Sequence, residues 1–402
     1  MQTTMNQKKS NRFTPLLMAL CIFIGIIIGT FYANHFSGNR LNIINSGSNR
    51  LSNLLHIISD QYVDEVNIDS LVDVAIPQIL SELDPHSVYI NSKQAQTATD
   101  DLKGSFSGIG VEFVIRQDTI HIQGVIKNGP AEKAGVLAGD KIVSVDGKPF
   151  VGKIVTQEEA MHRLKGPKDT KVKIGVVRYG SKMVHTFTIT RGDIPQKSIA
   201  ATYMLDDKTG YIRVKKFSET TYAELLISLA KLSQSGFTNL VIDLRDNTGE
   251  NLNAGLVAAD YCVPSGEIAK EQDKDGNVTT LRMSDENEIT VPMVCLVNSS
   301  TAGSAELFAN ALRKMAGATI VGTKTAGKGV VMSDAQSFSD GSAAYITVGL
   351  LLDNEDQTWN DEGLTPDIDA ALSVDEQNAY YDYTIDTDPQ ISKAVNAAMA
   401  LT

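Results

Sequence analysis

The sequence predicts an α/β domain that follows a β-rich module and a short helical segment. From Thr202 onward, strand-like and helix-like segments alternate, as in TGYIRVKKF, YAELLISLAKLSQSG and TNLVIDLRD. Such alternation is typical of an α/β layer with a largely parallel sheet. From Lys103 to Asp193 the chain instead has short, partly alternating strands and glycine turns. From Leu41 to Ile90 apolar residues recur at three- and four-residue steps, which indicates amphipathic helices.

Length and periodicity suggest five segments. The 402 residues are enough for two or three domains with their own cores. The helical segment has too few helices to form a domain alone, so we expect it to pack on the rest of the chain or on a second copy in a homo-oligomer. We place the boundaries at 1–36 for a tail and membrane anchor, 37–100 for the helical segment, 101–195 for the β-rich module, 196–372 for the α/β domain and 373–402 for a C-terminal helical tail.

The first 36 residues indicate a membrane anchor. Lys8, Lys9 and Arg12 precede an apolar run from Phe13 to Ala33, about the length that crosses a bilayer as a helix. The run is longer than the apolar core of a cleavable signal peptide, and only a poor cleavage site follows it. The basic flank places the N-terminus in the cytoplasm. We therefore expect the bulk of the chain to be extracytoplasmic, on the periplasmic face of the inner membrane.

Composition excludes several classes of function. A net charge of −12 argues against a nucleic-acid partner, because phosphate binding needs clustered Lys and Arg. The three cysteines show no CxxC spacing, and all six histidines precede residue 200, so no metal site and no cofactor are predicted. Cys262 and Cys295 are expected to be two separate buried thiols, and a bridge between them in an oxidising compartment stays open as an alternative.

The β-rich module carries a loop suited to a carboxylate. Gly108 and Gly110 flank Ile109 just before a strand, so the loop from Ser107 to Gly110 can turn its N–H groups toward one point. Beside this loop, a peptide C-terminus could add as a strand. Together with GPAEKAGVLAGDKI, the loop closely resembles a PDZ domain. The predicted peptide-binding residues are Ser107, Gly108, Ile109 and Gly110.

The α/β domain offers a nucleophile and a base without histidine. Because it lacks histidine, a Ser-His-Asp triad within it is excluded, whereas a serine activated by lysine is possible. The segment NSSTAGSAELFANAL, Asn298 to Leu312, follows the strand-like VPMVCLV and places hydroxyls at a strand-to-helix turn. The segment TKTAGKGVV supplies Lys328 within a glycine turn. If Lys328 is buried, its pKa falls and the neutral amine can accept a proton.

The order of motifs resembles the carboxyl-terminal processing peptidases, or tail-specific proteases, over about Leu51 to Asp369. The motifs are LDPHSVYI, the PDZ-like module, GYIRVKKFSE, LVIDLRDNTG, NSSTAGSAELFANAL, VGTKTAGKGVV, FSDGSAAYIT and DEGLTPDI. The resemblance implies a membrane-anchored serine-type peptidase with a ClpP/crotonase-like layer and an inserted PDZ domain. It also implies a Ser-Lys dyad that cleaves proteins near their C-termini, with the PDZ domain binding the tail.

Three residues depart from the pattern of this family. The position of its nucleophile, three residues before Glu306, is Gly303, and Ser304 follows one residue later. The supporting glutamine is replaced by Met332, and the second glycine of a turn that shapes the oxyanion hole is replaced by Glu250. Gly249 keeps its oxyanion role. Two hypotheses follow: an endopeptidase that uses Ser304 and Lys328, or a catalytically impaired protein that binds or regulates through its PDZ domain.

Overall fold

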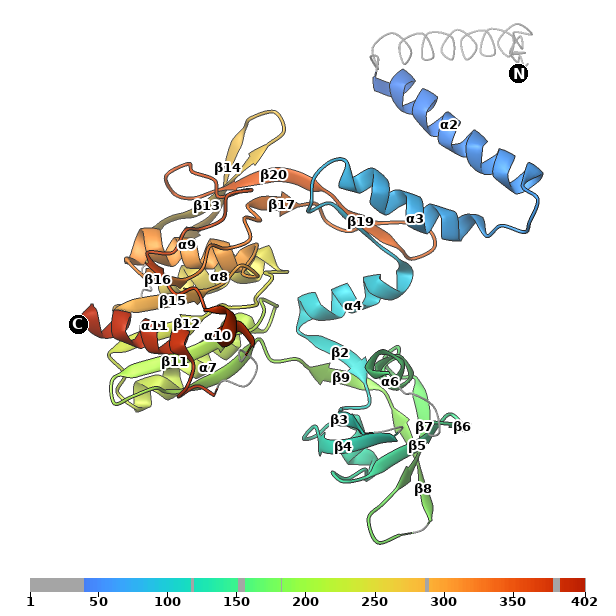
Figure 1. The fold of residues 1–402 in the computed structure, drawn as a ribbon, viewed down its shortest axis with the longest axis horizontal. Helices are drawn as coiled ribbons and strands as arrows, with labels where there is room; N and C mark the ends of the chain where they lie inside the picture. Colours follow the sequence, from blue (N-terminus) through green and yellow to red (C-terminus); the bar gives the residue numbers. More distant parts are fainter. Residues whose placement is uncertain are drawn as a thin grey trace, which may run out of the picture. The chain divides into compact units, whose positions relative to one another are not determined.

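The computed structural model describes residues 40–116, 119–150, 156–181, 183–285, 289–378 and 384–401 (Figure 1). The chain divides into two compact units, Met1–Ile76 and Pro77–Thr402. The predicted anchor, Phe13–Ala33, lies outside the described residues. None of the described helices has the length and hydropathy that a membrane crossing requires.

The segment predicted to be helical is helical. It contains α2 (Arg40–Gln61), α3 (Ile68–Ser81) and α4 (Ser92–Lys103). Between α3 and α4 the chain turns at Asp84, whose Oδ1 accepts the N–H groups of His86 and Ser87, both at 2.7 Å. The short strand β1 (Val88–Ile90) follows and pairs with β19 (Ala343–Tyr345). The turn at Asp84 is thereby joined to the α/β domain.

The β-rich module is an antiparallel sheet with a core of its own. Its strand order is β3-β4-β5-β7-β8, so β3 lies at an edge of the sheet. A separate pair, β2 with β9, joins the beginning of the module to its end. The elements are β2 (Ser105–Gly108), β3 (Val111–Arg116), β4 (Thr119–Val125), α5 (Pro130–Ala134), β5 (Lys141–Val145), β6 (Lys148–Pro149), α6 (Gln157–Leu164), β7 (Lys171–Val177), β8 (Val184–Thr190) and β9 (Gly192–Pro195).

The α/β domain is built on a six-stranded sheet in the order β10-β11-β12-β15-β16-β21. All neighbouring strands are parallel except β10 and β11, as the alternation of strands and helices predicted. The elements are β10 (Ile199–Met204), β11 (Thr209–Val214), α7 (Thr221–Gln234), β12 (Asn239–Asp243), α8 (Leu252–Cys262), β15 (Met293–Val297), α9 (Ser304–Ala316), β16 (Thr319–Gly322), β21 (Ile368–Asp369), α10 (Val374–Asn378) and α11 (Pro389–Ala400).

Helices cover both faces of this sheet (Figure 1). The apolar residues of α7, α8 and α9 pack on one face, with Ile212, Ile242 and Cys295 of the strands. Alternate strand residues, including Val241 and Val294, face α11 on the other side. Because successive strand residues point to opposite faces, nearly continuous apolar strands are needed for a sheet buried in this way.

A buried arginine joins α11 to the sheet. Arg245, whose side chain is 1% exposed, lies just after β12 and forms ion pairs with Asp243 at 2.7 Å and with Asp388 at 2.8 Å. Asp388 also caps α11, since its Oδ1 accepts the N–H of Gln390. The C-terminal segment is thus part of the core of the α/β domain.

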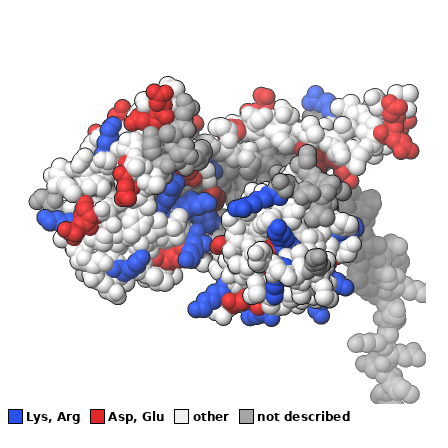
Figure 2. Space-filling view, turned by 60° about the horizontal axis from the view of Figure 1, so that its bottom comes forward, with Lys and Arg blue, Asp and Glu red and all other residues white. Residues whose placement is uncertain are grey.

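A second sheet, in the order β14-β13-β20-β17, lies beside α9 (Figure 1). Its strands are β13 (Gly266–Asp273), β14 (Val278–Ser284), β17 (Val330–Met332) and β20 (Thr347–Leu352), and β18 (Gln336–Ser337) pairs with β19. Cys262 and Cys295 are free and buried, and burial raises the pKa of both thiols. Figure 2 shows basic and acidic side chains mixed over the visible face, so the net negative charge does not form one continuous acidic surface there.

Candidate active site

The turn before α9 has the backbone of a strained strand-to-helix turn. Gly303 has φ +56° and ψ −121°, a conformation that residues with side chains rarely adopt. Strained backbone of this kind concentrates at functional sites, and nucleophiles of other hydrolases stand on sharp strand-to-helix turns. Here the strained position carries no side chain, and the first helical residue is Ser304.

A carbonyl oxygen lies against this position. A Cβ added to Gly303 would lie 2.8 Å from the carbonyl oxygen of Gly249. That oxygen also accepts the N–H of Ser304 at 3.4 Å, while the N–H of Gly249 donates to Asn247 Oδ1 at 3.0 Å. Stabilising an oxyanion requires free N–H donors. The oxyanion role predicted for Gly249 therefore requires this turn to rearrange.

Ser304 faces the protein interior. Ser304 is 1% exposed. Its Oγ forms no hydrogen bond with Lys328 or with any other described residue. Its Cβ packs against α8, where a Cβ added to Gly255 would lie only 2.7 Å away. A nucleophile should lie within about 2.6–3.2 Å of its base, although sites without substrate can be looser. In this conformation Ser304 is a packed core residue, and its role as nucleophile stays a prediction.

One carboxylate organises both halves of the site. Glu306 is fully buried on the first turn of α9, and its Oε2 accepts the N–H of Gly303 at 3.0 Å and that of Lys328 at 2.8 Å. Its Oε1 accepts the N–H of Gly327 at 2.8 Å and the hydroxyl of Thr325. Glu306 thus fixes the lysine loop beside the turn. We did not predict this role of Glu306. The signal in the sequence was a glutamate at the third position of the helix, three residues after Gly303, where a side chain can accept the N–H of the residue before the helix.

Lys328 has the electrostatics of a potential base. Burial lowers the pKa of its amine, while the negative charges of Glu250, Glu306 and Asp84 act in the opposite direction. No carboxylate oxygen lies within 4.0 Å of this amine among the described residues. A lowered pKa enlarges the neutral fraction that can accept a proton. Asp84, from the turn before β1, is a contributor that the sequence pattern did not reveal.

The other two departures also lie near this site. The Glu250 side chain accepts a hydrogen bond from Thr248 Oγ1 at 2.5 Å, in the same turn as Gly249. Met332, at the position of the supporting glutamine, ends β17, and its sulfur accepts a hydrogen bond from Thr347 at 3.8 Å. A thioether is a weak acceptor and cannot donate, so Met332 cannot replace an amide that orients the amine of Lys328.

The loop of the β-rich module has free donors at the edge of its sheet. Among the described residues, neither the N–H of Ile109 nor that of Gly110 donates a hydrogen bond, and Ser107 Oγ is buried without a partner. Gly110 has φ +75°, which lets successive N–H groups converge. β3 begins directly after this loop and is an edge strand. The predicted capture of a peptide C-terminus rests on these N–H groups and on the edge strand β3, and the roles of Ser107, Gly108, Ile109 and Gly110 stay predictions.

Comparison with known proteins identifies both the α/β domain and the β-rich module. The model of peptidase family S41 matches residues 208–370, and that of the PDZ domain matches residues 107–190. A carboxy-terminal processing protease, CtpA, of Bacillus subtilis is 32% identical over 325 residues, which cover 80% of this chain and 69% of the relative. The chain belongs to peptidase family S41.

Other relatives carry similar names. A carboxy-terminal-processing protease of Bartonella bacilliformis is 30% identical over 342 residues, covering 84% of this chain and 78% of the relative. A solved structure of a photosystem II D1 C-terminal processing protease is 26% identical. The match covers 79% of this chain and 91% of that protease, with a TM-score of 0.44. By family this S41 protein is a serine-type peptidase of the carboxy-terminal processing class with a PDZ domain, as the motifs implied.

Proposed function

We propose that this S41 protein captures the C-terminal tails of proteins through its PDZ domain and that its turnover is weak or absent. The weak or absent turnover is inferred from the turn before α9. There Gly303 occupies the strained position, the Cβ of Ser304 packs on α8, and the Ser304 hydroxyl is buried without a hydrogen-bond partner among the described residues. An endopeptidase needs a hydroxyl that both the base and the substrate can reach. The free N–H groups of Ile109 and Gly110 support the first part.

A second candidate is a working Ser304–Lys328 endopeptidase. It is favoured by the lowered pKa of the half-buried Lys328 amine and by Glu306, which still holds the lysine loop against α9. In this case the turn at Gly303 must rotate when substrate binds, and glycine, without a Cβ, offers the least resistance to such rotation.

Tail capture predicts a strong preference for free C-termini. A peptide with a free apolar C-terminus should bind the full chain about tenfold to hundredfold more tightly than its amidated form. The reason is that hydrogen bonds to a charged group contribute about 1.5–3 kcal/mol, and each 1.4 kcal/mol is tenfold. Fluorescence anisotropy with the labelled peptide pair measures the ratio, and equal affinities would remove the carboxylate-binding role.

A matched pair of glycine variants locates the site. Gly110→Ala should weaken binding of the peptide with the free C-terminus. Gly110 has φ +75°, which alanine rarely adopts, and the new Cβ would lie 2.9 Å from Ile194 Cδ1. Gly147→Ala is the control, since Gly147 also has positive φ, +74°, but nothing lies within 4 Å of an added Cβ. Unchanged binding in a folded Gly110→Ala protein would place the site elsewhere.

We also propose that Phe13–Ala33 anchors the chain and leaves the PDZ and S41 domains outside the cytoplasm, on the periplasmic face of the inner membrane. The support is the basic flank at Lys8, Lys9 and Arg12 before the apolar run. A reporter enzyme fused after His35 should be found active outside the cytoplasm and not within it. Activity confined to the cytosol would contradict this orientation.

A further inference from the structure

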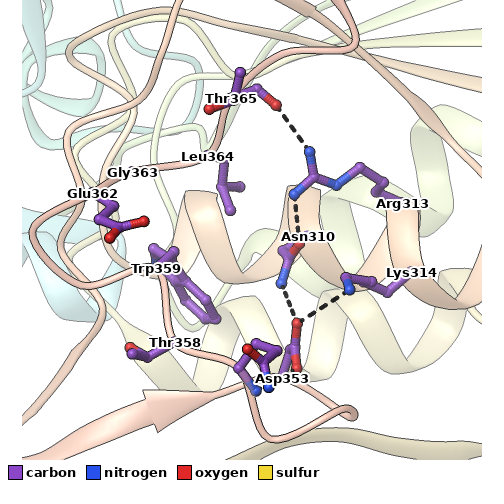
Figure 3. Close-up of a pocket in the computed structure, with 11 residues that line it drawn as sticks. Asn310, Arg313, Lys314, Asp353, Thr358, Trp359, Glu362, Gly363, Leu364 and Thr365 are labelled. Carbon is purple, nitrogen blue, oxygen red and sulfur yellow. Dashed lines mark hydrogen bonds and ion pairs between the residues drawn. The ribbon is translucent and has the colours of Figure 1, made fainter.

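The polar side chains of α9 that line a recess beside the loop from Asp353 to Thr365 are paired within the protein (Figure 3). Arg313 donates to the carbonyl of Thr365 at 2.9 Å and to Asn310 Oδ1 at 3.0 Å. Asn310 Nδ2 donates in turn to Asp353, which also lies 3.8 Å from the amine of Lys314. Groups that already have partners gain little from a ligand. A surface without such partners lies in the PDZ domain.

Four large apolar side chains are exposed together at one end of the PDZ domain. Their exposed fractions are 100% for Tyr179, 73% for Met183, 54% for Val184 and 52% for Leu137. Tyr179 and Met183 belong to the turn between β7 and β8, a hairpin that Figure 1 shows extending beyond the body of the domain. Single exposed apolar residues are ordinary, whereas a group of them indicates an interaction site. We call these four residues the tip.

An ion pair ties the two loops of the tip together. Arg178, which begins the turn between β7 and β8, pairs with Asp140 at 2.7 Å and donates to the carbonyl of Gly135 at 3.1 Å. Asp140 Oδ2 also accepts the N–H of Leu137 at 3.0 Å. The turn itself is closed by the N–H of Ser181, which donates to the carbonyl of Arg178 at 3.0 Å. The loop of Leu137 and the turn of the hairpin therefore lie side by side in a fixed arrangement.

Two exposed lysines flank the tip. Lys133 lies in the last turn of α5, just before the first loop of the tip, and Lys141 pairs in register with Val177, the last residue of β7. Neither amine forms an ion pair or a hydrogen bond among the described residues. The carboxylate of Asp140, next to Lys141 in the chain, is already paired with Arg178. The tip thus combines apolar side chains with unpaired positive charge.

The PDZ domain is the basic part of an acidic chain. Residues 101–195 hold 15 Lys and Arg and 10 Asp and Glu, whereas the whole chain holds 36 and 48. Charge complementarity therefore favours an anionic partner for this domain. Because the lysines surround an apolar tip, that partner must present negative charge directly beside an apolar phase.

We propose that the tip inserts into the interfacial layer of a bilayer that contains anionic lipids, while Lys133 and Lys141 contact the headgroups. Tyrosine is enriched at membrane interfaces because its ring is apolar and its hydroxyl is polar. A bilayer offers negative headgroups above an apolar layer, which matches lysines around an apolar tip. The inference rests on the proposed anchor, which keeps the PDZ domain close to a membrane, and not on turnover at the S41 site.

A tryptophan at the tip measures insertion. The full chain with Tyr179→Trp is reconstituted into vesicles of phosphatidylglycerol and phosphatidylcholine whose acyl chains carry bromine, a short-range quencher. The added emission should be quenched and shifted to shorter wavelength, and vesicles of brominated phosphatidylcholine alone should give much less of either change. The native Trp359 is the single tryptophan of the chain and is only 5% exposed, so the wild type reports the background. Val278→Trp, at an exposed position beside the β13–β14 turn, is the matched control and should stay at that background.

Two pairs of lysine substitutions test the charge. Lys133→Gln with Lys141→Gln, in the Tyr179→Trp protein, should lower the ratio of inserted to free tip at least about tenfold, because each cation near anionic headgroups contributes about fivefold. Lys171→Gln with Lys173→Gln removes two exposed lysines from the other end of β7 and should change the ratio little. At ~3.3 Å per residue they lie about 20 Å or more from Tyr179, beyond a Debye length of about 8–10 Å.

The proposal is overturned if Tyr179→Trp is quenched no more than Val278→Trp, if vesicles without phosphatidylglycerol quench it equally, or if the two lysine pairs have the same effect. A shift in emission that needs no lipid and grows with protein concentration would assign the tip to a second copy of the chain and overturn it as well. Flotation of the wild type with the vesicles tests the anchor separately. Quenching is measured whether or not the chain floats, so the anchor and the tip can fail independently.

Discussion

Arg245→Ala should lower the free energy of unfolding by about 3–5 kcal/mol, because it removes one partner of a buried ion-pair network and leaves uncompensated charge behind. The guanidinium is held between Asp243 at 2.7 Å and Asp388 at 2.8 Å, and its Nη1 also donates to Gln390 Oε1 at 2.9 Å. In the variant, two buried carboxylates lose their counter-charge. Denaturant unfolding of the protein measures the loss.

Two comparison variants separate the causes of that loss. Asp388→Asn should cost less than Arg245→Ala, because asparagine still caps α11 and Asp243 still pairs with the arginine. Lys168→Ala removes an exposed ion pair with Asp193 and should have little or no effect. A change of less than about 1 kcal/mol in Arg245→Ala, the scale of an exposed pair, would show that the network does not hold α11 to the sheet.

The parallel sheet followed from the sequence because its signal is local. The central strands β11, β12 and β15 are short apolar runs, and they are followed by the helices α7, α8 and α9, or by a turn and then the helix. The β13–β14 pair and its attachment to β20 were not predicted. In the attachment Lys270 pairs with Leu352, and pairing between strands so far apart in the chain depends on the whole fold. Burial of α11 was also missed, because its partner, Arg245, lies 143 residues before Asp388 in the chain.

The site was predictable in residue types but not in orientation. Lys328 in a glycine turn suggested a buried amine, and the structure places it in the loop that Glu306 holds. The direction of the Gly249 carbonyl was beyond sequence reasoning, because a peptide plane beside glycine is set by its neighbours and has no side-chain signature. For the same reason the sequence could not show whether the Ser304 hydroxyl is hydrogen-bonded to Lys328.

The second large effect concerns restoration of a nucleophile. The triple variant Gly303→Ser, Ser304→Ala, Met332→Gln places a hydroxyl on the strained position and an amide near Lys328. We expect it to cleave an unfolded model substrate at least about tenfold faster than wild type, because removing the nucleophile from other serine peptidases costs several orders of magnitude. The initial rate of fragment release measures this gain.

The turn from Thr248 to Glu250 limits that gain. A Cβ at position 303 would lie 2.8 Å from the Gly249 carbonyl oxygen, so this peptide must shift before the new serine fits. Adding Glu250→Gly to the triple variant gives the turn more freedom and removes a negative charge that acts on Lys328. The quadruple variant should therefore exceed the triple variant, and equal rates would show that Glu250 does not restrain the turn.

The rate of peptide-bond cleavage by wild type, compared with Lys328→Ala, tests the central claim most directly. Both proteins should be purified side by side and given the same unfolded substrate with a free apolar C-terminus. We predict equal, background rates, because no described hydroxyl is hydrogen-bonded to the Lys328 amine and the Ser304 hydroxyl is buried without a hydrogen-bond partner among the described residues. A wild-type rate at least about tenfold higher, lost in both Lys328→Ala and Ser304→Ala, would contradict the account and establish Ser304 and Lys328 as a working dyad.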